Sequence, residues 1–215
     1  PNGKPGTILL DPAAITIYDG TGSATSATVY EQWIESQSVA GVNVALAAAD
    51  TITMSALATD GVLQGGSGDI SLSVLGDDVT DGIFFDDITN TIRTTIGDII
   101  LNAGAGSGAV SGGVNLGNLE TTGNDGHITI NAGSGGIRVA SIATGGIGVE
   151  AAGDVALTTV NNGDITTGPI TITASTNSNW MASADLNINA GGGLIVNGDI
   201  NVTAFASPAS TGTAY

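Results

Sequence analysis

The stretch GDIILNAGAG at residues 97–106 returns as GHITINAGSG at 126–135 and as ADLNINAGGG at 184–193. The first two copies start 29 residues apart, and the third starts 58 residues after the second, which is twice the same interval. Recurrence at a fixed interval of this size is typical of proteins whose structural units stack on one another. The sequence is therefore expected to fold as a repeat protein.

Two weaker copies extend the repeat over most of the chain. GDISLSVL at 68–75 lies one interval upstream, and GDVALTT at 153–159 lies two residues before its expected position. A bend can absorb so small a contraction, because only the strands have to keep their register.

The composition favours a folded, aliphatic protein. Of the 215 residues, 34 are glycine, 41% are apolar and only 11% are charged, which is too apolar for a disordered tail. The chain has no G-X-Y period, which excludes collagen. No apolar run approaches the roughly 18–20 residues of a membrane-spanning helix, so no membrane insertion is expected. With 4% aromatic residues, the core must consist of Ile, Val, Leu and Ala, which favours thin layers.

The charge is strongly acidic, because 20 acidic residues face only Lys4, Arg93 and Arg138, for a net charge of -17. Nucleic acid is excluded as a partner, since its phosphates are bound through Lys and Arg. An anionic membrane surface is disfavoured for the same reason. There is no cysteine, hence no disulfide framework. The chain begins at Pro1 without a signal segment, so we expect a processed product or an excised piece of a larger protein.

The local pattern predicts short strands. In ITITAS at 170–175, Ile170 and Ile172 point to one side of a strand and Thr171 and Thr173 to the other. Similar alternating runs are separated by glycine-rich turns, where glycine allows positive φ without steric cost. Short strands of this kind occur in antiparallel sandwiches and in parallel solenoids. The 29-residue recurrence favours the solenoid, because only in a solenoid does like stack on like.

We therefore predict an all-β fold, a single parallel β-helix domain over residues 1–215 with roughly seven coils and a polar tail at 206–215. With strands about 4.8 Å apart, such a rod is about 35 Å long. Each coil is expected to hold three strands and three bends. The copy at 126 divides into GHITINAG, GGIRVASIATG and GIGVEAA, and the copy at 184 into ADLNINAG, GGLIVNG and DINVTAF.

Stacking at this interval predicts interior columns and a polar ladder. One column contains Ile99, Ile128, Val155 and Leu186, and the next contains Leu101, Ile130, Leu157 and Ile188. Asn102, Asn131 and Asn189 recur at one place in the NAG element. Either their amides hydrogen-bond between coils, or asparagine merely tolerates the turn conformation there.

One segment interrupts the β pattern. In TVYEQWIES, Thr28 and Glu31 have the spacing of a capping box, and Trp33 and Ile34 follow Tyr30 at helical spacing. We predict a short helix at 28–37 that seals a flank or an end of the solenoid, with Trp33 packed on the core. Trp180 follows the polar run STNSN and is the better candidate for surface recognition.

The sequence does not favour an enzyme, and no catalytic, cofactor-binding or metal-binding residue is assigned. Glycoside hydrolysis needs two carboxylates in one groove, and GDDVTDGIFFDDI supplies five candidates. They are Asp77, Asp78, Asp81, Asp86 and Asp87. His127 stands alone in a slot that holds aspartate in other repeats, which indicates a substituted turn residue rather than a general base.

A calcium site and an ice-binding face are two further hypotheses, and for both the alternative is an ordinary solvated surface. The five aspartates offer oxygen ligands for calcium, but their spacing matches neither an EF-hand nor a nonapeptide repeat. The pairs Thr51 with Thr53 and Thr171 with Thr173 resemble an ice-binding motif, which would have to recur in coil after coil.

The order of GKPGTILLDPAAITI (3–17), VYEQWIES, VNVALAAADTITM and the GDIxLNAG repeats resembles the filamentous haemagglutinin family of large bacterial surface exoproteins. The likeness is to the region just after that family's secretion domain. It implies a right-handed parallel β-helix, export by two-partner secretion, a secreted or cell-surface location, and a role in adhesion, biofilm or cell contact. The signal peptide and most of the secretion domain expected upstream are missing here.

Two functional hypotheses follow. The first is a non-catalytic adhesin or stalk segment whose partners are glycans or proteins on host or neighbouring cells. The alternative is a self-assembling subunit whose coils stack end to end into an extracellular filament. A polysaccharide-cleaving β-helix enzyme ranks third.

Overall fold

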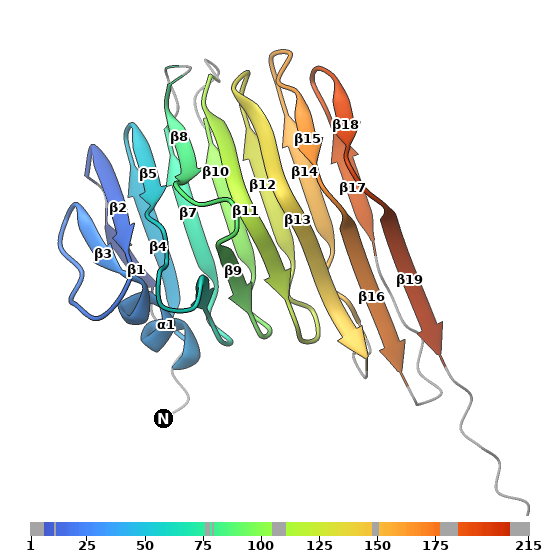
Figure 1. Cartoon of the computed structure of the whole chain (residues 1–215), viewed down its shortest axis with the longest axis horizontal. Coiled ribbons are helices and arrows are strands. Elements are labelled where there is room, and N and C mark those ends of the chain that lie inside the picture. The colour runs from blue at the N-terminus through green and yellow to red at the C-terminus, as the bar shows by residue number, and fades with distance from the viewer. Residues whose placement is uncertain are drawn as a thin grey trace, which may run out of the picture.

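The computed structural model describes residues 7–10, 12–75, 78, 80–104, 111–147, 151–176 and 185–206. Within these ranges every strand pairing is parallel. Successive coils lie side by side in chain order from one end of the molecule to the other (Figure 1). The protein is a β-solenoid, as the repeat predicted.

The first face of the solenoid is a seven-stranded sheet. Its strands, in order, are β1 (Thr7–Leu10), β4 (Asn43–Ala48), β7 (Ile70–Val74), β10 (Ile99–Ala103), β12 (Ile128–Ala132), β14 (Val155–Thr159) and β17 (Leu186–Asn189). The repeats that begin at residues 68, 97, 126 and 153 supply β7, β10, β12 and β14, so the repeated motif forms this face.

The remaining strands form the second and third faces. The second face contains β2 (Ala14–Tyr18), β5 (Thr51–Met54), β8 (Gly82–Phe85), β15 (Ile165–Thr167) and β18 (Leu194–Val196), with β3 (Thr28–Tyr30) beside β2. The third contains β6 (Val62–Gln64), β9 (Thr91–Thr94), β16 (Ile170–Thr176) and β19 (Ile200–Ala206). Two long strands, β11 (Gly113–Thr121) and β13 (Gly136–Ile147), belong to both faces: their first halves pair with β8 and β15, and their second halves with β9 and β16.

The structure corrects two details of the predicted coils. Five of the seven levels of the first sheet lie between two neighbours, so there are about five full turns rather than roughly seven. In the coil that starts at Gly126, the third strand does not begin at GIGVEAA. Instead, β13 runs without a break from the second face into the third, because its neighbours β11 and β16 continue the hydrogen-bonding pattern past the corner.

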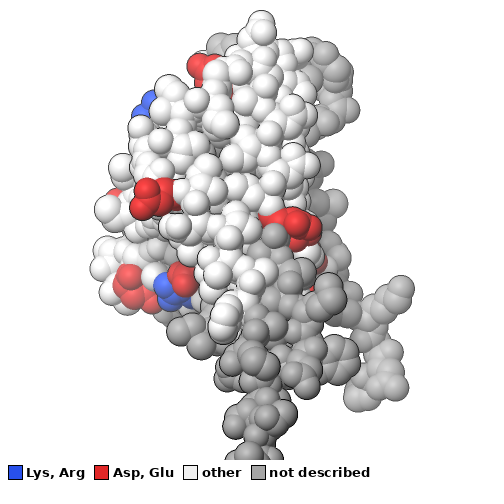
Figure 2. All heavy atoms as spheres, turned by 90° about the vertical axis from the view of Figure 1, so that its right-hand side faces the viewer, with Lys and Arg blue, Asp and Glu red and all other residues white. Residues whose placement is uncertain are grey.

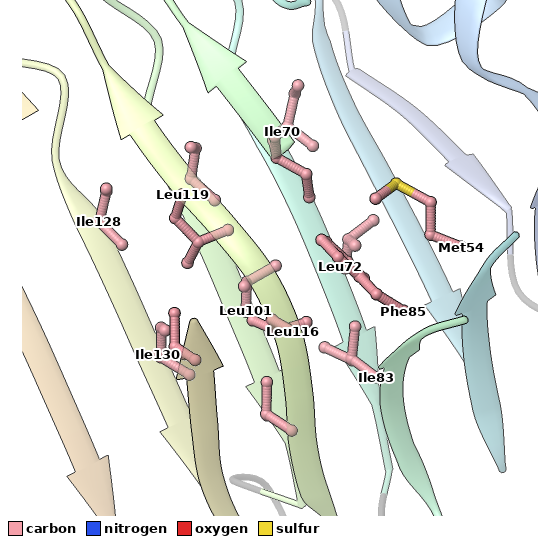
Figure 3. Close-up of a cluster of buried hydrophobic side chains, with 14 of the residues drawn as sticks. Met54, Ile70, Leu72, Ile83, Phe85, Leu101, Leu116, Leu119, Ile128 and Ile130 are labelled. Atoms are coloured by element: carbon pink, nitrogen blue, oxygen red, sulfur yellow. The ribbon is translucent and has the colours of Figure 1, made fainter. Parts of the chain in front are cut away.

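The predicted interior columns are confirmed. Ile99, Ile128, Val155 and Leu186 are register partners from coil to coil, and so are Leu101, Ile130, Leu157 and Ile188. All are fully buried except Leu186 and Ile188, which are half-buried because they lie in the last coil. Figure 3 shows aliphatic side chains of β7, β10 and β12 meeting those of β8 and β11 in the interior. Each such burial contributes about 1.5–3 kcal/mol, and chain entropy offsets most of the sum.

The asparagine ladder is confirmed for two of its three members. Asn131 and Asn102 are register partners, and Asn131 Nδ2 donates a hydrogen bond to Asn102 Oδ1 at 2.8 Å. Asn189 is not part of this ladder, because the coil between them places Thr158 at the same position. Side-chain amides therefore link coils only where they are direct neighbours.

The predicted helix is present, but it starts later and is capped differently. The helix α1 spans Glu31–Val39, since Thr28–Tyr30 pair with β2 as the parallel strand β3. The capping-box interpretation is wrong, because the cap residue is Tyr30 and no side chain caps the helix. Trp33 is half-buried and packs against the core, as predicted.

Instead of pairing with Thr28, Glu31 turns its carboxyl group into the interior. Its exposed fraction is 3%, Oε1 accepts a hydrogen bond from the Gly20 N–H at 3.2 Å, and Oε2 is buried without a partner. Burial raises the pKa of Glu31 from 4.5 to about 7, and the nearby charges of Asp19 and Glu35 add to the rise, against the opposing Gly20 hydrogen bond.

We expect Glu31→Gln to flatten the pH dependence of stability. A carboxyl group whose folded pKa is raised binds its proton more tightly in the folded state, so its stabilisation is complete below pH 4.5 and is lost as pH rises toward 7. From pH 4.5 to pH 8, wild type should lose about 1–3 kcal/mol more unfolding free energy than the variant. Urea unfolding at several pH values measures this difference, and parallel pH curves for both proteins would contradict it.

Candidate functional site

The aspartate cluster of the sequence is divided in space. Asp81 precedes β8, while Asp86 and Asp87 follow it, so the two groups lie on the order of 16 Å apart along an extended strand. That exceeds the roughly 5–10 Å between the carboxylates of glycosidases. Asp77 lies outside the described residues. Within the described chain, no three His, Cys, Asp or Glu residues gather closely enough to hold a metal ion.

Asp81, before β8, and Asp87, after it, both accept hydrogen bonds from residues of their own turns. Asp87 Oδ1 accepts hydrogen bonds from the Thr89 N–H at 2.8 Å and from its hydroxyl at 2.7 Å, and these bonds lower the pKa of Asp87. Asp81 Oδ2 accepts a hydrogen bond from the Asp78 N–H at 2.9 Å. These carboxylates therefore hold loop backbone in place.

His127 belongs to a ladder of side chains that runs along the solenoid just before the first face. The Asp98 N–H donates to Asp69 Oδ1 at 3.0 Å, and the His127 N–H donates to Asp98 Oδ1 at 2.8 Å. In turn the Asp154 N–H donates to His127 Nδ1 at 2.9 Å. In this hydrogen bond the imidazole nitrogen takes the acceptor role that a carboxylate oxygen has in the preceding coils, and Asp154 Oδ2 lies 3.7 Å from the same Nδ1. His127 occupies the aspartate slot that the repeat assigned to it.

The two threonine pairs do not form a common array. Thr51 and Thr53 lie on β5 of the second face, whereas Thr171 and Thr173 lie on β16 of the third face. Trp180, the proposed recognition residue, lies outside the described residues.

The N-terminal end of the solenoid is closed on one side by α1, which contacts β3, β4 and β6. Glu35 Oε1 accepts a hydrogen bond from the Gln64 N–H at 2.6 Å, which occupies an edge amide of β6. Ser38 Oγ accepts from the Gly66 N–H at 2.9 Å and donates to the Gly68 carbonyl at 2.6 Å. Burial raises the pKa of Glu35, against the opposing hydrogen bond from Gln64. The helix thus takes the place of a further strand on the third face.

The C-terminal coil has no comparable cover among the described residues. Leu194, Ile200 and Val202 are register partners of Ile165, Ile170 and Ile172, which are fully buried, yet they are 45–48% exposed. The view onto this end shows mostly uncharged surface with scattered acidic and basic groups (Figure 2). Core positions are therefore half open to solvent at this end.

A groove of about 300 Å³ lies near the corner between the second and third faces. Its lining comes from five successive coils, from Ile88 after β8, through β11, β13 and β15, to Asn197 after β18. Its walls combine apolar and polar groups: Ile88, Leu116, Val139, Pro169, Asn115, Arg138, Thr166 and Asn197.

The two arginines of the described chain differ in their surroundings. Arg93 forms an ion pair with Glu120 at 2.7 Å, its register neighbour on β11. Arg138 is exposed, and its register neighbours are Asn115 and Thr166, neither of them acidic. Among the described residues Arg138 therefore has no ion-pair partner, and its guanidinium is available at the groove.

Sequence reasoning missed both the groove and the helix contacts. The sequence shows that Arg138 is one of few basic residues, but it does not predict that Arg138 lies near the bend of β11 and β13. Ser38 and Glu35 act on residues about 30 positions away, and no local pattern announces such contacts.

Comparison with known proteins gives no relative: no family model, no curated protein and no solved structure matches this chain. Within the described residues, no helix has the length and apolar character needed to cross a membrane.

Proposed function

We propose that this chain is a non-catalytic structural segment of a bacterial surface exoprotein, a β-solenoid adhesin or stalk that mediates adhesion, biofilm formation or cell contact. It would act outside the cell, at the bacterial surface. The observation that carries the proposal is the stack of parallel coils, in which buried residues of each coil are register partners of those in the coils before and after it.

Such a solenoid suits the role of a spacer. Its core columns and side-chain ladders connect each coil only to its neighbours, so a rod of this kind is stiff along its axis and is lengthened by adding coils. Its acidic surface, from a net charge of -17, keeps neighbouring rods apart. The separation of Asp81 from Asp86 and Asp87 by β8 supports a structural role over polysaccharide cleavage.

Assembly into a filament is the second candidate, and the open C-terminal coil favours it. Exposed strand edges and half-buried aliphatic residues attract further strands. A head-to-tail filament, however, would have to bring β19 of one copy against α1 of the next on the third face. Because α1 occupies the edge of β6, this arrangement fits less well than a stalk.

Three measurements on the purified chain test the proposal. Beads coated with the chain should bind host cells or neighbouring bacteria more than beads coated with albumin. Electron microscopy should show short separate rods, and incubation with surface polysaccharides should release no new reducing ends. Regular fibres would favour the filament, new reducing ends would favour an enzyme, and adhesion no greater than that of albumin would contradict the adhesin.

A further inference from the structure

We propose that the groove around Arg138 binds an acidic sugar unit, a carboxylate-bearing residue of a cell-surface glycan. The inference rests on the proposed adhesin function and names the ligand class that such an adhesin would take. It is carried by three features of the described chain: the concave corner, the unpaired guanidinium and the mixed polar and apolar walls.

The charge of the ligand follows from Arg138. In a chain with a net charge of -17, this guanidinium is the described cation without an ion-pair partner. A planar guanidinium binds a carboxylate through two parallel hydrogen bonds, which gives orientation as well as affinity. Arg93 does not offer the same chemistry, since Glu120 already occupies it at 2.7 Å.

The walls of the groove favour a sugar over a peptide. Both β11 and β13 are paired on each side, so no strand edge is free in the middle of the groove for a peptide to extend. A sugar instead presents apolar C–H surfaces and polar hydroxyl groups. Ile88 and Pro169 supply exposed apolar contacts, and Thr166 and Asn197 supply hydroxyl and amide groups.

Asn115 adds a polar amide side chain beside Arg138. It lines the groove, although its Oδ1 is shielded from solvent and has no hydrogen-bond partner. The volume of about 300 Å³ lies at the lower end of small-ligand pockets, so it accommodates a short segment of glycan.

Binding of a glucuronic acid–N-acetylglucosamine tetrasaccharide, measured by NMR titration or calorimetry, tests the inference. The neutral tetrasaccharide of N-acetylglucosamine is the ligand control. We expect the acidic ligand to bind at least about tenfold more tightly than the neutral one, and Arg138→Gln to weaken acidic binding at least about tenfold. Arg93→Gln removes the same charge elsewhere and should leave binding unchanged.

The inference is overturned if Arg138→Gln binds as wild type does, if Arg93→Gln weakens binding equally, or if both tetrasaccharides bind alike. Circular dichroism of each variant checks that the fold is retained. Failure of this site and failure of the adhesin proposal are distinguishable. Coated beads that adhere without dependence on Arg138 contradict only the groove, whereas sugar binding without bead adhesion contradicts only the adhesin role.

Discussion

Gly153→Ala is expected to lower the free energy of unfolding by at least about 3 kcal/mol. Gly153 precedes β14, and a β-carbon there would overlap the backbone carbonyl oxygen of Gly126 in the preceding coil. Because two backbones approach each other, no side-chain rotation relieves the overlap. The coils have to move apart instead, which weakens the hydrogen bonds of the first face.

Gly126→Ala is the matched control, since Gly126 holds the equivalent place one coil earlier. Its added β-carbon would lie 3.0 Å from Thr121 Cβ and 3.3 Å from the Gly97 carbonyl oxygen, so a small shift accommodates it. Neither glycine has a φ in the left-handed region, so the comparison isolates close approach. Urea unfolding followed by circular dichroism measures both variants. Equal losses would contradict the prediction that the closer backbone approach at Gly153 makes its substitution more costly.

The repeat itself explains why the fold was predictable from the sequence. In the GDI element, glycine permits close approach of neighbouring coils, aspartate accepts the backbone N–H of the next coil, and isoleucine fills an interior column. All three roles depend on the coil directly before or after, so they recur once per coil, at intervals of 27 to 31 residues. Because each coil needs the same residue types at the same positions, the sequence repeats, and the spacing of the repeats was enough to assign the interior columns.

Features that occur once were not predictable in the same way. The segment around Trp33 was correctly predicted as a helix, but its start was shifted because Thr28 to Tyr30 pair with β2. Glu31 accepts a hydrogen bond from Gly20, not from the helix start. Gly65 shows the same limit: a side chain there would meet Ser38 Oγ at 2.9 Å, since Ser38 fills the space. Such contacts are set by packing between distant segments.

Residues that are close in the sequence are not close in space when a strand lies between them. Asp81 and Asp86 are five positions apart, but β8 extends between them, so they lie on the order of 16 Å apart along the strand. Conversely, Asn115, Arg138 and Thr166 are far apart in the sequence and lie next to one another across three coils. Only the strand register brings these three residues to one site.

Ile130→Ala is expected to lower the free energy of unfolding by about 2–5 kcal/mol, whereas Ile188→Ala should cost less than about 1.5 kcal/mol. Both isoleucines belong to the same column, and Ile130 is fully buried between two coils. Its truncation leaves a cavity that neighbouring coils cannot collapse without breaking their register. Ile188 is half-buried in the last coil, where solvent already reaches it.

Denaturant unfolding of the two variants at several protein concentrations measures the difference and also bears on assembly. If the C-terminal coil is open in solution, the Ile188 variant stays close to wild type at every concentration. A loss at Ile188 as large as that at Ile130, growing with protein concentration, would mean that another copy covers the last coil. That result would favour the filament over the stalk, because the same side chain would then be buried by a neighbour.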